Sequence, residues 1–235
     1  MTLRGSTAWG RGRRRPGRPP AIGEAEIAEA VLAVGFRDLT FAGVAERLSV
    51  GQATLYRHAA NRDALVRMGL DLALRRIEWP DLEGSWRELL ERWSLASWHA
   101  WEHYPGAVTE ATRGVVPASM VELSDRIGLA LVDRGFSPRN AVLAVDLVFD
   151  LAADSRRGVE AMAATLESQP ASVRQAMEAE WATQHGSSEA AAQLRGEMVR
   201  AIREDPAAWF HGKLRIVLAG IDHELAPEHT HEEQR

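Results

Sequence analysis

The chain contains no cysteine, so neither a disulfide framework nor a cysteine-ligated zinc site is available to it. It has no run of about 18 apolar residues, and its first twenty residues lack the apolar stretch that a signal peptide requires. We therefore expect a cytoplasmic protein that does not enter a membrane. β-Branched runs with period-two alternation are scarce, while Ala, Leu, Arg and Glu dominate, which predicts an all-α fold.

The net charge of -5 conceals two parts of opposite sign. Residues 1–76 hold 13 Arg and 7 acidic residues, a net charge of +6, so residues 77–235 carry -11. A basic end on an acidic protein favours local contact with a polyanion, because attraction to phosphate is short-ranged at cellular salt. A solvated basic tail is the alternative.

Local signals predict two helices close to the N-terminus. The first should span residues 24–34, where apolar residues recur at i, i+4 and i+7 and Gly35 follows the last of them. The hydroxyl of Thr40 is suited to cap a second helix of about eight residues beginning at Phe41.

The spacing after Phe41 is typical of a helix-turn-helix. Ala45 and Leu48 should face inward on the second helix, residues 49–51 form the turn, and Leu55 faces inward on a short third helix. The outward side chains of that third helix are small, polar or aromatic, which suits a DNA major groove. A helical bundle that does not contact DNA is the alternative. The outward residues are Gln52, Ala53, Thr54, Tyr56, Arg57 and His58.

The first helix, the pairs Gly35-Phe36 and Leu39-Thr40, and the stretches "VAERLSV", "TLYRH" and "NRDAL" resemble the DNA-binding domain of the TetR/AcrR family of transcriptional repressors. The resemblance covers about residues 22–70. It implies that Tyr56 and His58 meet the DNA backbone and that Thr40 contacts a phosphate. The base-reading positions that it implies are Gln52, Ala53, Thr54 and Arg57.

Arg62 stands where the family often has lysine, at a helix start that favours a phosphate. Two departures from the family pattern concern the recognition helix. Gly51 offers no side-chain acceptor for a cap, and Ala59 replaces a frequent aromatic residue. We therefore expect the same fold with a recognition helix that is less firmly held.

The first twenty residues contain six Arg, no acid and many Gly and Pro residues, which predicts a disordered arm. The stretch "RRRPGRPP" resembles arms that follow the narrow minor groove of A·T-rich DNA. We predict Arg18 in that groove, with Arg13, Arg14 and Arg15 on phosphates. Nonspecific attraction by a disordered tail is the alternative.

The family resemblance implies that the part after residue 76 dimerises through its last long helices and holds a small-molecule pocket. Residues 138–154 and 207–225 are long and apolar enough for the dimer role. Two recognition helices would then meet half-sites about 34–36 Å apart or further on a partly palindromic operator. Completion of a monomeric core is the alternative. The predicted interface residues are Leu214, Val217, Leu218 and Ile221, with Gly220 allowing close approach.

Five of the eight tryptophans lie between residues 79 and 104. Trp86, Trp93 and Trp101 are spaced to share a helical face, which is either packed core or the aromatic wall of a pocket. Both interpretations remain open from the residues alone. The predicted ligand-binding residues are Trp86, Trp93, Trp98, Trp101 and His103.

Two polar sets have competing interpretations. His99 and His103 have the i, i+4 spacing of metal ligands, but no third ligand is evident and the stretch is typical of a helix end, so we predict neither a metal nor a cofactor. Asp146, Asp150 and Asp154 form an acidic stripe on an apolar helix. They could neutralise a cationic ligand, pair with an Arg across a dimer, or face water.

No nucleophile elbow, phosphate-binding glycine loop or metal motif is present, so we predict that the protein is not an enzyme. The function predicted is that of a ligand-responsive repressor that binds a palindromic operator as a homodimer. An activator of the same family and an architectural DNA-binding protein without an effector remain alternatives. The predicted parts are the arm at 1–20, the DNA-binding domain at 21–76, the effector-binding and dimerisation domain at 77–225, and a disordered tail at 226–235.

Overall fold

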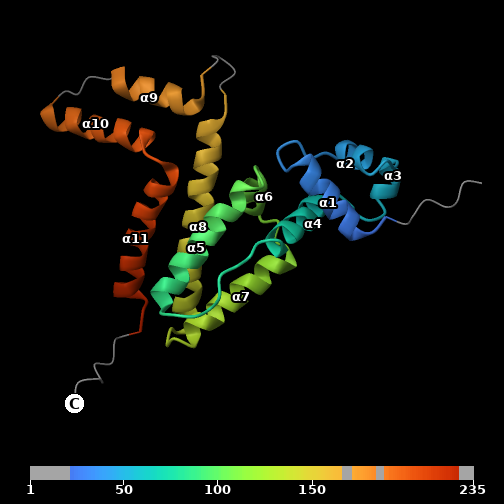
Figure 1. Ribbon diagram of the computed structural model, residues 1–235, viewed down its shortest axis with the longest axis horizontal. Helices are drawn as coiled ribbons and strands as arrows, with labels where there is room; N and C mark the ends of the chain where they lie inside the picture. The colour runs from blue at the N-terminus through green and yellow to red at the C-terminus, as the bar shows by residue number, and fades with distance from the viewer. Residues whose placement is uncertain (1–21, 166–170, 184–187, 228–235) are drawn as a thin grey trace, which may run out of the picture.

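The computed structural model describes residues 22–165, 171–183 and 188–227 (Figure 1). Over these ranges all regular elements are α-helices, apart from one isolated antiparallel bridge between Thr165 and Ser172, and the all-α prediction is confirmed. The helices are α1 Glu24–Val34, α2 Phe41–Arg47, α3 Gln52–Leu55, α4 Arg62–Arg75, α5 Trp86–Glu102, α6 Ala107–Ala111, α7 Ala118–Val132, α8 Pro138–Ala163, α9 Val173–Thr183, α10 Glu189–Arg203 and α11 Pro206–Glu224.

Helices α1 to α4 form the small bundle at one end of the molecule (Figure 1). Helix α1 packs against α4 at Gly69, where an added Cβ would lie only 2.4 Å from Val31 Cγ1. Gly35, with φ of 86°, ends α1 as predicted. The Thr40 hydroxyl accepts a hydrogen bond from Gly43 N at 3.0 Å and so caps α2, again as predicted.

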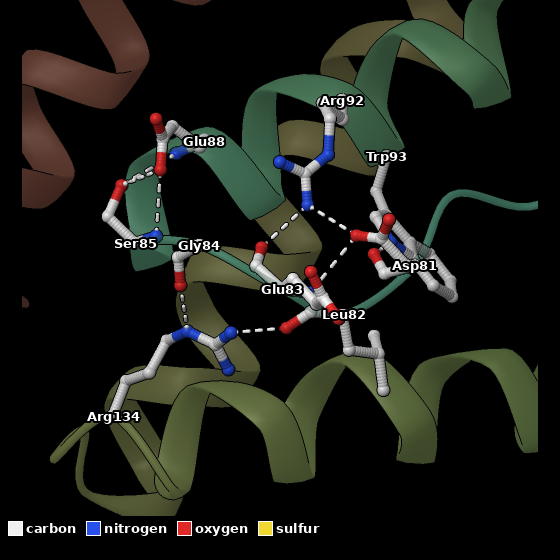
Figure 2. Close-up of polar contacts among 9 residues, drawn as sticks. All are labelled: Asp81, Leu82, Glu83, Gly84, Ser85, Glu88, Arg92, Trp93 and Arg134. Atoms are coloured by element: carbon white, nitrogen blue, oxygen red, sulfur yellow. Dashed lines mark hydrogen bonds and ion pairs between the residues drawn. The ribbon is translucent and has the colours of Figure 1, made fainter.

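The segment between α4 and α5 is fixed by side chains from α5 and from the turn that follows α7 (Figure 2). Ser85 and Glu88 form a capping box that begins α5. Arg92 donates to Asp81 Oδ1 at 3.0 Å and to the Glu83 carbonyl at 2.6 Å. Arg134, which follows α7, donates to the carbonyls of Leu82 and Gly84. The segment therefore holds the start of α5 against the end of α7.

The larger part of the molecule is built around α8, which packs against α5, α7 and α11. Its core includes Trp93 from α5, Val148 from α8 and Phe210 from α11, all fully buried. The core of the small bundle continues into this part, because Trp101 and Val108 pack with the apolar side chains of α1 and α4. The two parts thus share an apolar junction.

Helices α9 and α10 pack against each other and extend away from the main body (Figure 1). Arg203 pairs with Glu178 at 2.5 Å, and Arg174 donates to the Ile202 carbonyl at 2.7 Å. None of the helices in the described ranges combines the length and apolarity that a membrane span would need.

Candidate nucleic-acid interface and ligand cavity

The recognition segment, residues 52–58, begins with a helix of only four residues and continues as a tight turn. Leu55 and Ala59 are buried and anchor it, and His58 N and Ala59 N both donate to the Leu55 carbonyl. The outward side chains are exposed except for the half-buried Thr54. The structure therefore presents the predicted DNA-contacting residues together on one surface segment: Gln52, Ala53, Thr54, Tyr56, Arg57 and His58.

An aromatic stack that we did not predict supports this segment. The rings of Phe41 and Tyr56 are parallel within 9°, with centroids 4.2 Å apart, and Tyr56 remains 52% exposed. Because Phe41 is the first residue of α2, the stack ties the start of α2 to the end of the recognition segment. The sequence places two aromatic residues here, but their contact depends on the angle between α2 and α3.

The turn between α2 and α3 holds its shape through the backbone. Ser49 has a φ of 55°, a left-handed conformation that is uncommon outside glycine, and Val50 N donates to the Ala45 carbonyl at 2.9 Å. Gly51 caps α3 without any side-chain hydrogen bond. The recognition segment therefore depends on Leu55, Ala59 and the aromatic stack for its position.

Arg62 lies at the start of α4, but its guanidinium is turned toward the larger part of the molecule. It makes a bidentate pair with Glu110 of α6, at 3.0 and 2.8 Å, and donates to the carbonyls of Phe36 and Leu39. The hydrogen bond with Glu110 raises the pKa of Arg62, and the same bond lowers the pKa of the carboxyl group, whose side chain is only 8% exposed. Contact between Arg62 and a phosphate would require this pair to open.

Thr40 remains exposed beside the recognition segment, with its hydroxyl oxygen occupied as the cap of α2. The four arginines predicted to contact DNA from the arm lie outside the described residues. They are Arg13, Arg14, Arg15 and Arg18.

The loop between α1 and α2 makes a second close contact with the larger part. Gly106, with φ of 87°, would place an added Cβ 3.0 Å from Arg37 N. Glu160 of α8 accepts from Gly106 N at 2.8 Å and from Arg37 at 3.1 Å. Together with the pair between Arg62 and Glu110, these contacts connect the α1–α2 loop to α6 and α8.

A cavity of about 530 Å³ lies among the helices from α4 to α8. Most of its wall is apolar, and its aromatic members are Trp79, Trp101 and Phe149. Helix α6 contributes Val108 and Ala111, followed by Thr112, so one short element both lines the cavity and carries Glu110. A volume of this size suits a small organic molecule.

Of the predicted ligand-binding residues, Trp101 alone lines this cavity. Trp93 is fully buried, stacks on Trp79 at 5.3 Å and donates from Nε1 to the Asp81 carbonyl at 3.1 Å. Trp98 stacks on Phe210 at 4.6 Å. These two tryptophans thus pack in the interior away from the cavity, because a helical face can pass from core to cavity along its length.

The two other predicted ligand residues lie elsewhere. Trp86 meets Phe136 edge to face at 5.6 Å, near the start of α5. His103 caps the end of α5, where it is exposed and bonds through Nδ1 to the His99 carbonyl at 3.1 Å. Across the described ranges, no group of three or more His, Asp or Glu residues is arranged to hold a metal ion.

Sequence reasoning missed the contribution of α7 and α8 to the cavity wall. Asp125 and Leu129 come from α7, and Val145, Asp146 and Asp150 come from α8. The acidic stripe on an otherwise apolar helix was the available signal for α8. For α7 no comparable signal is present, because the side of the helix that lines the cavity is decided by packing between distant segments.

The predicted dimer stripe on α11 faces the interior of the same chain. Leu214, Leu218 and Ile221 are buried in the core around α8, and Val217 is partly buried against it. The outer side of α11 instead exposes Trp209 and Ile216. An apolar periodicity cannot tell an internal face from an external one when a helix carries both.

Residues 26–67 match the sequence model of a family described as bacterial regulatory proteins, tetR family. No match is found among curated proteins. The fold is similar to that of the TetR family protein ActR from Streptomyces coelicolor in complex with actinorhodin, at 19% identity, with 87% of this chain and 96% of that chain covered and a TM-score of 0.72. Minocycline is bound in a second similar structure, a TetR variant from Acinetobacter baumannii AYE, at 23% identity, coverage of 90% and 96%, and a TM-score of 0.62. Mycobacterium smegmatis BioQ shares 17% identity, with coverage of 85% and 97% and a TM-score of 0.61.

Proposed function

We propose that the chain is a TetR-family transcriptional regulator, and more specifically a cytoplasmic, ligand-responsive repressor that binds a palindromic operator as a homodimer; the family match of residues 26–67 and the similar fold support the proposal. The observation that carries the proposal is the recognition segment, which exposes polar and aromatic side chains over two buried anchors, Leu55 and Ala59. A major groove about 12 Å wide admits one helix of this kind.

Within this segment the roles follow from side-chain chemistry. Arg57 can donate two hydrogen bonds to a guanine edge, and Gln52 can pair with adenine. Tyr56 and His58 can donate to phosphates, and Thr40 lies at the start of the neighbouring helix. The basic arm, with Arg18 in an adjacent minor groove, would add affinity that depends strongly on salt.

The proposed dimer uses the outer sides of α8 and α11. Leu143 and Leu147 of α8 and Trp209 and Ile216 of α11 are exposed apolar residues on neighbouring helices. An added Cβ at Gly220 would meet no atom within 4 Å, so this side of α11 is open to close approach. We expect the charge introduced by Ile216→Glu to convert dimers into monomers in sedimentation-velocity experiments; unchanged sedimentation would remove this face from the interface.

Coupling between ligand and DNA is proposed to run through α6. This helix lines the cavity with Val108 and holds Arg62 through Glu110, and Arg62 binds the carbonyls of the loop that precedes α2. A ligand that shifts α6 would therefore alter the position of the DNA-binding helices. In a dimer, that change would favour a half-site spacing incompatible with the operator.

The decisive experiment is in-vitro selection of full-length protein against random double-stranded DNA at near-physiological salt, followed by sequencing. We expect enrichment of an inverted repeat, as a two-fold dimer requires. Enrichment of A·T-rich sequences without a repeat would contradict the proposal and favour an architectural protein dominated by its arm. Placing the selected operator upstream of or over a promoter in a reporter assay then separates activation from repression.

A further inference from the structure

The charge on the cavity wall has a single sign. Asp125 of α7 and Asp146 and Asp150 of α8 line the cavity from exposed positions, and no Lys, Arg or His among the described residues does so. None of the three carboxylates has a hydrogen bond or ion pair with another described residue. By contrast, Asp154 on the next turn of α8 pairs with Arg157 at 2.5 Å. The unpaired acids on α8 are thus those that line the cavity.

Holding these acids together is unfavourable in the empty protein. Asp146 and Asp150 lie at i, i+4 on α8, where like charges destabilise a helix. Partial burial, followed by repulsion from Asp146 and Asp154, raises the pKa of Asp150. A cation placed between α7 and α8 would relieve this repulsion, whereas an anion would increase it.

A neutral polar group also lies in the wall. Ser97 of α5 is only 3% exposed, lines the cavity, and its hydroxyl has no hydrogen-bond partner in the described part of the chain. Because it faces the cavity without a partner from the described residues, this hydroxyl is free to hydrogen-bond a bound molecule. Trp79, Trp101 and Phe149 provide faces that attract a cation as well as an apolar body.

We propose that the cavity binds a lipophilic organic cation, a molecule with an apolar and preferably aromatic body whose positive charge is placed near Asp146 and Asp150. The inference builds on the proposed function, because it names the chemical class of the effector. Three observations carry it: the charged side chains of the cavity wall are all acidic, the Ser97 hydroxyl has no partner among the described residues, and aromatic side chains line the cavity.

Tetraphenylphosphonium and tetraphenylborate provide a matched test, since the two ions have almost the same size and surface and opposite charges. Their binding to the full-length protein is measured by isothermal titration calorimetry without DNA. We expect the phosphonium ion to bind at least about ten-fold more tightly than the borate ion. Equal affinities, a preference for the borate ion, or no saturable binding of either ion would overturn the proposal.

A double variant with a control substitution tests whether the cavity aspartates bind the cation. The double substitution Asp146→Asn and Asp150→Asn keeps the side-chain shape and should weaken phosphonium binding about ten-fold or more. Asp133→Asn removes one negative charge, against two in the double variant, from an exposed position at the end of α7, outside the cavity wall, and should leave the affinity unchanged. Equal loss in both variants would reduce the effect to overall charge and overturn the assignment to the cavity.

Gly128→Leu tests the location without changing charge. Gly128 lines the cavity, and an added Cβ there would meet no atom within 4 Å, so the leucine side chain can occupy cavity volume. We expect phosphonium binding to weaken by about ten-fold or more. Undiminished binding would place the ion elsewhere and overturn the proposal.

The outcome is separable from that of the proposed function. If the selection yields an operator and the cation does not bind, the ligand class is wrong while the DNA-binding regulator stands. If the cation binds through Asp146 and Asp150 but leaves operator affinity unchanged, the ligand class is supported and the effector role of the cavity fails.

Discussion

The recognition segment and the cavity differ in charge, exposure and support. Residues 52–58 lie on the surface with Arg57 and His58 outward and rest on two buried side chains and one aromatic stack. The cavity lies among five helices and has a mostly apolar wall, in which the only charged members among the described residues are aspartates. If DNA and a lipophilic cation bind as proposed, they would occupy separate sites, and any coupling between them would pass through the protein.

The largest effect on stability should come from removing a tryptophan of the core rather than one of the cavity wall. Trp93→Ala removes a fully buried ring, its stack on Trp79 and its bond to the Asp81 carbonyl, so we expect the free energy of unfolding to fall by about 3–5 kcal/mol. Urea denaturation measures this change. Trp93→Phe keeps much of the ring and should cost clearly less. A loss below about 1 kcal/mol for the alanine variant would contradict the core role.

The ion pair between Arg62 and Glu110, which connects the two parts of the molecule, can be tested at Glu110. Glu110→Gln replaces a charge-assisted pair with Arg62 by a neutral contact, and we expect a loss of about 1.5–3 kcal/mol in the free energy of unfolding at pH 7. Glu122 of α7 pairs with Arg75, which lies on α4 as Arg62 does, but this glutamate is largely exposed. Glu122→Gln should therefore cost less than about 1 kcal/mol. Equal costs would contradict a special role for the junction.

The same pair predicts a pH dependence. The pKa of Glu110 in the folded protein lies below its ordinary value, so its carboxylate contributes stability fully above the unfolded pKa. That contribution is lost as pH falls through the lower, folded pKa. The stability difference between the wild-type protein and Glu110→Gln should therefore be largest near neutral pH and shrink below about pH 4 in urea titrations. A difference that is constant over this range would contradict the assignment.

Recognition can be tested at Arg57. We expect Arg57→Ala to weaken binding to the selected operator by about 1–3 kcal/mol and to relax preference at one base position, measured by fluorescence anisotropy. Arg67→Ala removes the same charge from an exposed position on α4, outside the recognition segment, and should have a smaller effect that is similar for all sequences. Equal losses without a change of preference would restrict Arg57 to nonspecific attraction.

The smallest effect should come from the support of the recognition segment. Phe41→Leu removes the ring under Tyr56, and we expect operator binding to weaken by about 0.5–1.5 kcal/mol. Tyr56→Phe keeps the stack and removes only the hydroxyl, so comparing the two variants separates position from direct contact. If only Tyr56→Phe weakens binding, the stack has no role in positioning.

The parts of this structure that could be predicted from the sequence are those that depend on residues close together in the chain. The bounds of α1, the Gly35 stop and the Thr40 cap follow from signals within a few positions, and all three are present. The bond from Arg62 to Glu110 joins residues 48 positions apart, and no local pattern indicates it. Helix periodicity likewise identified an apolar stripe containing Leu214 but could not decide which neighbour would cover it.

Helix α6 spans only Ala107–Ala111, and so short a helix has almost no stability of its own. Its conformation depends on Val108 packing in the core and on the ion pair of Glu110. We therefore expect its amide hydrogens to exchange with solvent by local opening, faster than those of α4, which has a continuous buried side. A ligand that rests on Val108 would slow that exchange, so the exchange rate of hydrogen-bonded amides such as that of Glu110 could report occupancy of the cavity even when no DNA is present.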